Sequence, residues 1–334
     1  MTSMWALRIL SRFLAMVGTI PRRKDGTVHR KLADLFEWVI SANPQRADGV
    51  VAFDVVVDAE TGIWVRVFVP AQGMGGDSSE LNPKADEMMP VIVYYHGGGF
   101  VFMKPNVTLY DQFCRRLAGK CSAVVVSVHY RRAPEHKCPT AYNDCYAVLE
   151  WLNSEKAEAI LPANVDLSRV YLAGDSAGGN IAHHVAILAA GKDLSPLTLR
   201  GLVLIQPFFG GEERTAAELQ MKDPLIVSLE LLDWYWKAYL PPDSNRDHPA
   251  SNVFGPYSRD ISNVAIPPVL VIVGGLDPLQ EWQMKYVKEM VTIGKKVEVC
   301  FFEDGVHMFG QLKQIEIAEQ MLIDIASFLE NREE

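Results

Sequence analysis

The chain has 334 residues, 49% of them hydrophobic, and a formal net charge of −9. A chain of this length can bury a large core, and α/β folds commonly reach it as one domain. The acidic balance, with no basic stripe after residue 24, argues against a nucleic-acid partner. No uninterrupted run of 18 apolar residues occurs, so no membrane-spanning helix is predicted.

The cysteines form an odd set with neither C-x-x-C nor Cys/His metal spacing. A disulfide framework and a metal site are therefore not predicted, and no cofactor is expected. Reduced thiols fit a cytoplasmic protein, and a nuclear location is left open. The five residues are Cys114, Cys121, Cys138, Cys145 and Cys300.

The N-terminal end allows two interpretations. Residues 1–24 carry five basic side chains and no acid, as an organelle transit peptide does. The alternative is an amphipathic helix, because apolar residues recur at intervals of three and four. These residues are Leu7, Leu10, Leu14 and Val17. With a second helix predicted over residues 29–40, residues 1–45 would form an N-terminal helical lid.

From residue 50 the apolar period changes to two, and residues 51–57 and 63–69 are predicted to form a hairpin that turns at Thr61 and Gly62. Residues 72–89, rich in Gly, Ser, Asp and Pro, are predicted as a surface loop. Six buried apolar runs follow, at 91–95, 123–128, 170–173, 202–205, 269–273 and 297–301. Helical stretches between them predict an α/β fold with a mostly parallel central sheet and helices on both faces.

Residues 210–257 differ in character from the rest of the chain. Trp234, Trp236 and Tyr239 crowd a short predicted helix that ends before Pro241. These aromatic side chains are either ordinary core or part of a second cap segment that walls a pocket. We therefore expect the whole chain to be one domain, with a cap insertion at about 210–257.

The sequence Gly-Asp-Ser-Ala-Gly-Gly-Asn at 174–180 joins a strand-like run to a helix-like run. Its Gly-x-Ser-x-Gly pattern is typical of a nucleophile held at a sharp strand-to-helix turn. Gly174 and Gly178 leave room, because larger side chains there would crowd the strained turn. Ser176 is thus the predicted nucleophile, although a short Gly/Ser pattern also arises by chance.

The run His96-Gly97-Gly98-Gly99 stands at the end of the apolar stretch 91–95. Successive glycines let backbone N–H groups approach a ligand atom closely, and such a loop supplies part of the oxyanion hole in esterases and lipases. A flexible turn is the plainer interpretation, but the serine motif downstream favours the oxyanion role. The predicted donors are the N–H groups of Gly97, Gly98 and Ala177.

A serine hydroxyl is a poor nucleophile until a base takes its proton, and that base must itself be oriented. Asp277 follows the apolar run 269–273, and His307 follows the run 297–301. This is the order Ser, Asp, His that α/β-hydrolases use. Asp277 is therefore the predicted orienting acid and His307 the predicted base, with Asp304 as a rival acid.

Five segments together resemble the hormone-sensitive-lipase-like carboxylesterases, and among them the plant carboxylesterases. The segments are 96–99, 130–135 (Tyr-Arg-Arg-Ala-Pro-Glu), 174–180, 275–279 and His307. The resemblance covers most of the chain and implies an α/β-hydrolase fold with an N-terminal lid. It also implies a Ser176–Asp277–His307 triad and the hydrolysis of carboxylic esters without a cofactor.

The chain also resembles the gibberellin receptors in residues 22–27, 110–117 and 233–238 and in the first helix. This resemblance favours the lid over the transit peptide. It further implies a contrast, because the receptors have lost the catalytic histidine and carry Ser at the position of Gly99. Here His307 and Gly99 are both present.

The candidate pocket residues are Phe13, Gly99, Tyr110, Asp175 and Leu232. Leu231 and Leu232 stand where the receptors carry charged side chains, which argues against a carboxylated hormone. Asp175, beside the nucleophile, either forms local hydrogen bonds or touches substrate. An apolar lid and an aromatic cap predict a small, largely apolar ester as the substrate.

The first hypothesis is an active serine carboxylesterase with a small-molecule ester substrate. The alternative is a gibberellin-receptor-like protein that uses the same pocket for a hormone-like ligand and its closed lid for a protein partner. A third hypothesis is a dehydratase or transferase on the same scaffold.

Overall fold

The computed structural model describes residues 20–43, 48–70, 88–220, 227–313 and 315–331. The predictions for the first lid helix, including Phe13, and for most of the loop 72–89 lie outside these ranges.

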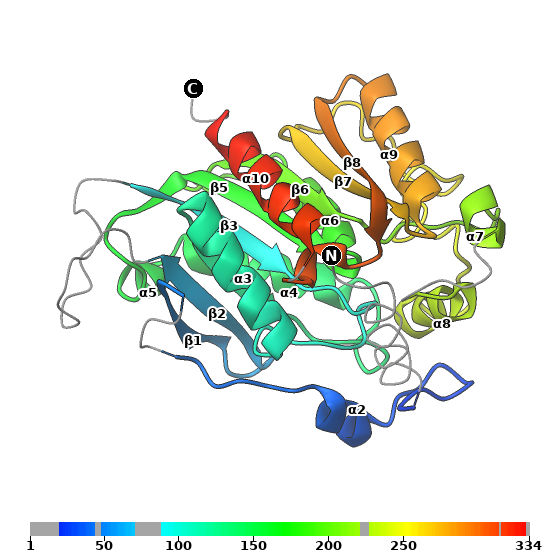
Figure 1. Ribbon diagram of the computed structural model, residues 1–334, viewed down its shortest axis with the longest axis horizontal. Coiled ribbons are helices and arrows are strands. Elements are labelled where there is room, and N and C mark those ends of the chain that lie inside the picture. The colour runs from blue at the N-terminus through cyan, green and yellow to red at the C-terminus, as the bar shows by residue number, and fades with distance from the viewer. Residues whose placement is uncertain (1–19, 44–47, 71–87, 221–226, 314, 332–334) are drawn as a thin grey trace.

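An eight-stranded sheet runs through the molecule in the order β1-β2-β4-β3-β5-β6-β7-β8 (Figure 1). Its strands are β1 (Val50–Asp58), β2 (Ile63–Pro70), β3 (Met89–Tyr95), β4 (Val124–His129), β5 (Val165–Asp175), β6 (Leu199–Ile205), β7 (Val269–Leu276) and β8 (Val297–Val306). β1 pairs antiparallel with β2, and β2 with β4, whereas every other pair is parallel. The predicted hairpin and the predicted mostly parallel sheet are both confirmed.

Helices lie on both faces of this sheet, as predicted (Figure 1). They are α2 (Arg30–Phe36), α3 (Thr108–Cys121), α4 (Thr140–Leu152), α5 (Glu155–Glu158), α6 (Ala177–Ala189), α7 (Ala216–Gln220), α8 (Leu229–Tyr239), α9 (Gln280–Thr292) and α10 (Glu316–Glu330), with a short 3₁₀ helix η1 (Phe309–Gln311). Side chains alternate between the two faces along a strand. On β3, Ile92 packs in the core beneath α3 and α10, while Val91 and Val93 pack in the core shared with α4 and α6.

The second lid helix is shorter than predicted. The expected helix over 29–40 begins with His29, whose ring accepts a hydrogen bond from the Leu32 N–H, but it ends at Phe36. Beyond it the chain is extended and bonds to the start of α3, with Thr108 N–H donating to the Trp38 carbonyl at 2.8 Å. This backbone pairing between the segment after α2 and the start of α3 replaces the helical hydrogen bonds, so α2 ends early.

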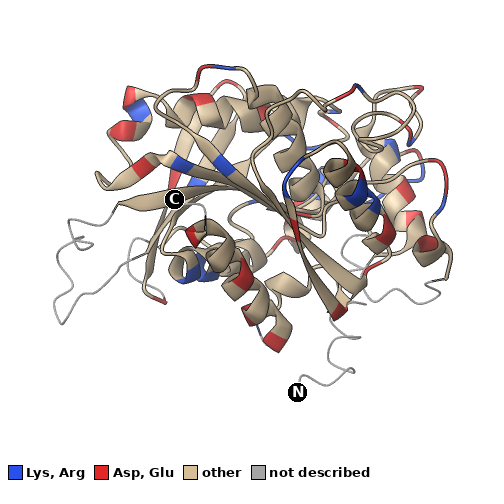
Figure 2. Ribbon diagram, turned by 90° about the horizontal axis from the view of Figure 1, so that it is seen from above, with Lys and Arg blue, Asp and Glu red and all other residues tan. Residues whose placement is uncertain are grey.

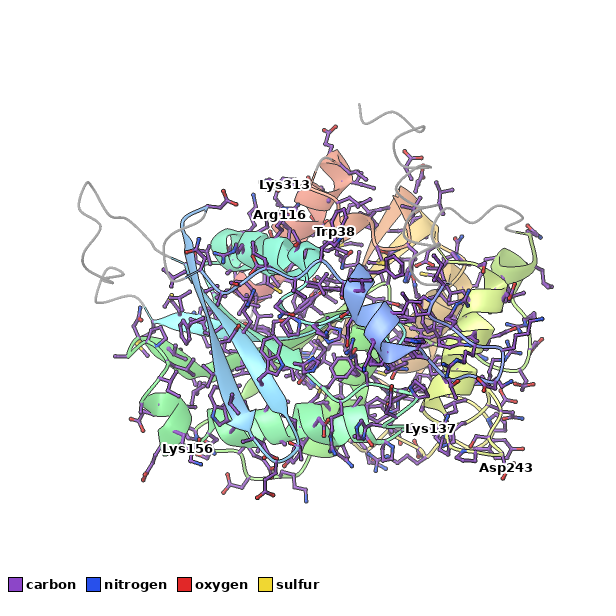
Figure 3. All side chains as sticks on the ribbon, turned by 90° about the horizontal axis from the view of Figure 1, so that it is seen from below. Trp38, Arg116, Lys137, Lys156, Asp243 and Lys313 are labelled. Carbon is purple, nitrogen blue, oxygen red and sulfur yellow. The ribbon has the colours of Figure 1, made fainter. Side chains whose placement is uncertain are left out.

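The N-terminal segment rests on α8. The indole N–H of Trp234 donates to the Arg23 carbonyl at 2.7 Å, and Lys237 Nζ donates to the Lys24 carbonyl at 3.1 Å. Lys137 binds the C-terminal end of α8, where its Nζ donates to the Ala238 carbonyl at 2.7 Å (Figure 3). These contacts bring two segments that are distant in sequence together over the carboxyl ends of the strands. The division into a lid at 1–45 and a cap insertion at 210–257 stays a prediction.

Charged residues of both signs are interspersed over the described ribbon (Figure 2). Within the described part of the chain, no helix is long and apolar enough to cross a membrane. The same residues contain no group of three or more His, Cys, Asp or Glu that could hold a metal ion. All five cysteines carry free thiols.

Candidate active site

Ser176 stands at the turn between β5 and α6. Its backbone has φ 53° and ψ −117°, a strained conformation for a residue with a side chain. A β carbon on Gly178 would overlap the Tyr95 carbonyl, and one on Gly174 would overlap the backbone of Gly178. The prediction that small residues are required on both sides of the serine is therefore confirmed.

The structure brings Ser176, His307 and Asp277 into one hydrogen-bonded chain. His307 Nε2 lies 3.0 Å from Ser176 Oγ, and His307 Nδ1 lies 2.8 Å from Asp277 Oδ2. All three side chains are buried. Asp304, the rival acid, is exposed. The three residues, far apart along the chain, thus lie side by side, with the His307 imidazole between the Ser176 hydroxyl and the Asp277 carboxylate.

The charge near the imidazole makes His307 a stronger base than a free histidine. Burial by itself lowers the pKa of His307, but the charge and hydrogen bond of Asp277, aided by the charge of Asp175, outweigh it and raise the pKa above 6.5. A raised pKa increases the affinity of the ring for the serine proton. The geometry and the electrostatics therefore suit a general base.

The carboxylate of Asp277 is held by several donors. The Leu279 N–H donates to Oδ1 at 2.9 Å, while Gln206 Nε2 and Gln283 Nε2 each donate to Oδ2 at 3.0 Å. Sequence reasoning missed both glutamines. Neither belongs to a motif, and only the loop position of Gln206, directly after an apolar run, offered a signal.

The glycine loop after β3 corrects one predicted oxyanion donor. The Gly97 N–H donates to Asp175 Oδ1 and to Tyr110 Oη, at 2.9 Å each, and so is unavailable to a substrate. Gly98 and Gly99 line the cavity beside Ser176 instead. Both have positive φ, 97° and 61°, which glycine adopts without strain.

Free N–H groups remain around Ser176. In the described part of the chain, the N–H groups of Gly98, Gly99 and Ala177 form no hydrogen bond. Ala177 is the first residue of α6, where an N–H group has no partner within the helix. The oxyanion donors predicted at Gly98 and Ala177 thus remain candidates, and Gly99 replaces Gly97 beside them.

Asp175 and Tyr110 support the loop and do not line the cavity, which corrects their prediction as pocket residues. Asp175 accepts from Tyr94 Oη at 2.6 Å and from Tyr110 Oη at 2.9 Å. Burial raises the pKa of Asp175, and these hydrogen bonds, with that of the Gly97 N–H, oppose the rise. Of the two roles left open for Asp175, the structure shows local hydrogen bonding.

The motif at 130–135 fixes the start of the glycine loop. Tyr130 Oη donates to the His96 carbonyl at 2.8 Å, and the two rings stack with centroids 4.3 Å apart. Burial lowers the pKa of His96 to about 3, so this imidazole is neutral. His96 is therefore part of the packing beneath the loop.

An apolar cavity of about 230 Å³ opens above Ser176 and His307. Apolar side chains from five segments form most of its wall: Phe36, Trp38, Phe102, Met103, Val107, Leu109, Phe208, Val227, Leu231, Leu232, Tyr235, Met308 and Leu312. Trp38, just after α2, contributes from the lid side (Figure 3). Of the predicted pocket residues, Gly99 and Leu232 line this cavity.

One charged side chain, Glu37, also lines the cavity and joins the lid to the body. Its carboxylate accepts from the Met103 N–H at 2.6 Å and from Arg132 at 2.9 Å, and it lies 3.2 Å from Lys104 Nζ. Arg132 and Lys104 also pair with Asp34 of α2. We call these five residues the lid latch. In the sequence, Arg132 appeared only as part of the motif at 130–135, and the latch was not predicted.

Fold and sequence define the class of this protein. A family model described as the alpha/beta hydrolase fold matches residues 92–311, and the chain belongs to this family. The chain is 41% identical to a gibberellin receptor of Arabidopsis thaliana, covering 92% of this chain and 89% of the receptor. It is 32% identical to carboxylesterase 20 of the same plant, covering 93% and 94% of the two chains.

Among solved structures, the chain is similar to a hyperthermophilic esterase from the archaeon Pyrobaculum calidifontis. The TM-score is 0.74 at 28% identity, and the match covers 97% of each chain. The fold is thus one that esterases share.

Proposed function

We propose that this protein is a serine carboxylesterase that hydrolyses small, largely apolar carboxylic esters through an acyl-enzyme on Ser176. The supporting observation is the unbroken chain from Asp277 Oδ2 through His307 to Ser176 Oγ, with steps of 2.8 and 3.0 Å, at the floor of an apolar cavity. His307 Nδ1 faces the carboxylate of Asp277 and His307 Nε2 faces the hydroxyl of Ser176, which is the arrangement that proton transfer from the serine requires.

In the first half-reaction, Ser176 Oγ attacks the ester carbonyl carbon while its proton passes to His307 Nε2. The carbonyl oxygen becomes an oxyanion that faces the N–H groups of Gly98, Gly99 and Ala177. Each such donor is worth about 10²–10³ in rate. The imidazolium then returns its proton to the alcohol oxygen as the carbon–oxygen bond breaks, leaving the acyl group on the serine.

In the second half-reaction, His307 takes a proton from water as the water oxygen attacks the acyl carbon. Collapse of the second tetrahedral intermediate breaks the bond to Ser176, whose oxygen regains a proton from the imidazolium. The carboxylic acid leaves, and the free serine is restored.

The cavity wall supports a neutral, apolar substrate. Among the described residues that line it, the one carboxylate, Glu37, is already paired with the two cations of the lid latch. A substrate with an additional charge would therefore lose its hydration without gaining a partner there. A cavity of about 230 Å³ favours short acyl and alcohol groups.

The test uses purified protein with nitrophenyl acetate, butyrate and octanoate and with an organophosphate. We expect turnover that falls for the longest ester, and one covalent adduct on Ser176 by intact mass. The Ser176→Ala protein should show neither. Absence of turnover with all three esters, together with absence of the adduct, would contradict the proposal.

A second candidate function is binding of a hormone-like ligand without catalysis. The 41% identity to a gibberellin receptor over most of both chains favours it. In that case the parent protein would bind its ligand tightly with negligible esterase activity, and Ser176→Ala would bind as well as the parent. Calorimetry on both proteins, beside the esterase assay, separates the two functions.

A further inference from the structure

Two neutral amide side chains meet at the carboxylate that orients the imidazole. Gln206 and Gln283 each place Nε2 at 3.0 Å from Asp277 Oδ2, the same oxygen that His307 Nδ1 approaches at 2.8 Å. The side chain of Gln206 is 1% exposed, and those of Gln283 and Asp277 are fully buried. One carboxylate oxygen thus accepts three hydrogen bonds, and their directions fix its position.

Gln206 also forms hydrogen bonds with the backbone on both sides of His307. Its Nε2 lies 3.1 Å from the Val306 carbonyl, and its Oε1 accepts from the Met308 N–H at 2.9 Å. Val306 and Met308 are the residues immediately before and after His307. A single side chain therefore connects the acid to both ends of the peptide that holds the imidazole.

Residues that flank Gln206 connect the same segment to Ser176 through their backbone. The Ser176 N–H donates to the Ile205 carbonyl at 2.9 Å, and the Phe208 N–H donates to the Ser176 carbonyl at 2.9 Å. Gln206 itself has φ 45°, in the left-handed region that disfavours side chains. Such strain persists where surrounding contacts impose it, often at functional sites.

Because the two amides are neutral, they bind Asp277 without reducing the effect of its charge on His307. A buried carboxylate needs donors, and an arginine would supply them. However, a full positive charge beside Asp277 would cancel the field that makes His307 a strong base. Amide N–H groups hold the ionised carboxylate in place while leaving its net charge available to the imidazole.

Resting on the proposed esterase function, we propose that Gln206 is a positioning residue that aligns Asp277 and His307 with each other and with Ser176, and that Gln283 assists it from the acid side. Gln206 has the larger effect because both ends of its amide are bound. The Oε1 of Gln283 has no hydrogen-bond partner among the described residues, so its amide is held from the donating end.

The test replaces Gln206 by methionine, which keeps the length and approximate volume of the side chain but removes the amide. We expect kcat to fall about 10²-fold, since misplacement by about 1 Å costs that much, with KM changed less than twofold. Gln283→Met should lose about tenfold. Gln280→Met is the matched control, because the Gln280 side chain donates to the Gly275 carbonyl at 2.7 Å and to none of the triad side chains. Its backbone N–H donates to the Asp277 carbonyl at 3.1 Å, and the substitution keeps that bond.

A second readout separates positioning from loss of fold and does not need turnover. The His307 Nδ1 proton gives a downfield NMR resonance when its hydrogen bond to Asp277 is short. We expect this resonance to move upfield or vanish in Gln206→Met and to persist in Gln280→Met, with unfolding temperatures recorded for each protein. If the parent lacks esterase activity but the resonance behaves in this way, the proposed function fails and the positioning role stands.

Two results would overturn the positioning role. The first is a folded Gln206→Met protein whose kcat and resonance both match those of the parent. If that variant does not fold, Gln283→Met decides the question, and parental kcat and resonance in it would show that the amides do not align the triad.

Discussion

Asp175 offers the sharpest test of how the glycine loop is supported. The perturbation is Asp175→Ala, which removes the acceptor for Tyr94 Oη at 2.6 Å, for Tyr110 Oη at 2.9 Å and for the Gly97 N–H at 2.9 Å. The Gly97 N–H keeps its bond to Tyr110. Two buried hydroxyls lose an acceptor, and each such loss costs about 1–3 kcal/mol. The free energy of unfolding should therefore fall by about 2–6 kcal/mol.

The effect on the reaction follows from the position of Gly97 beside Gly98. Without Asp175 the Gly97 N–H loses one of its two acceptors, and the loop is then held by Tyr110 and by the contact of His96 Nδ1 with the Gly97 carbonyl at 2.9 Å. The weaker hold lets the Gly98 N–H shift away from the oxyanion. Loss of one such donor costs about 10²–10³ in rate, so kcat should fall about 10²-fold with little change in KM. The measurements are denaturant unfolding and the kinetics of nitrophenyl butyrate hydrolysis.

The control is Asp166→Ala on the same strand, β5. Asp166 accepts hydrogen bonds from Ser168, which is exposed, and from Arg169, which is partly exposed, both close in sequence. Its loss should therefore cost less than about 1 kcal/mol and leave kcat unchanged. If Asp175→Ala were folded and retained kcat within twofold of the parent, the support of the oxyanion loop by Asp175 would be refuted.

Three further predictions concern the base, the loop and the lid. The pKa of His307 is raised above 6.5, and the ring accepts the serine proton only when neutral, so kcat/KM should rise with pH through a midpoint above 6.5; a midpoint below 6 would contradict this. In Gly99→Ser the new β carbon would overlap the Tyr235 ring. We therefore expect at least a tenfold loss of kcat/KM and a lower melting temperature. Parental values of both would show that the Tyr235 ring moves aside without cost. Glu37→Gln weakens the lid latch and should lower stability by about 1–3 kcal/mol and raise KM, whereas Glu135→Gln, in a more exposed pair with Arg30, should change stability by less than 1 kcal/mol. Equal effects of these two variants would argue against the latch.

Much of the fold could be predicted because its signals are local. The buried strands at 91–95 and 269–273 are continuous apolar runs, and the period of two over residues 51–57 marks the hairpin. The helix predicted over 29–40 failed at its second half because the bonds that end it come from Met103 and Thr108, which are distant in sequence.

The same division holds within the candidate site. Ser176, Asp277 and His307 could be assigned from the sequence because each follows a strand, and strand ends in such a sheet collect at one edge. The orientation of the Gly97 N–H could not be assigned, since a peptide plane is set by its partners and glycine allows many orientations. Gln206 was missed because one glutamine carries no pattern.

By itself, then, the sequence determined which segments form the sheet strands, the sharp turn at Ser176 and the candidate acid and base, Asp277 and His307. The tertiary structure decided which N–H groups remain free for an oxyanion, how Asp175 holds the loop, and how Glu37 ties the lid to the body. The physical reason is the sequence separation between the residues that interact. Strand period and turn chemistry act between neighbouring residues, whereas these hydrogen bonds join residues dozens of positions apart, and only the packed sheet brings their partners within 3 Å.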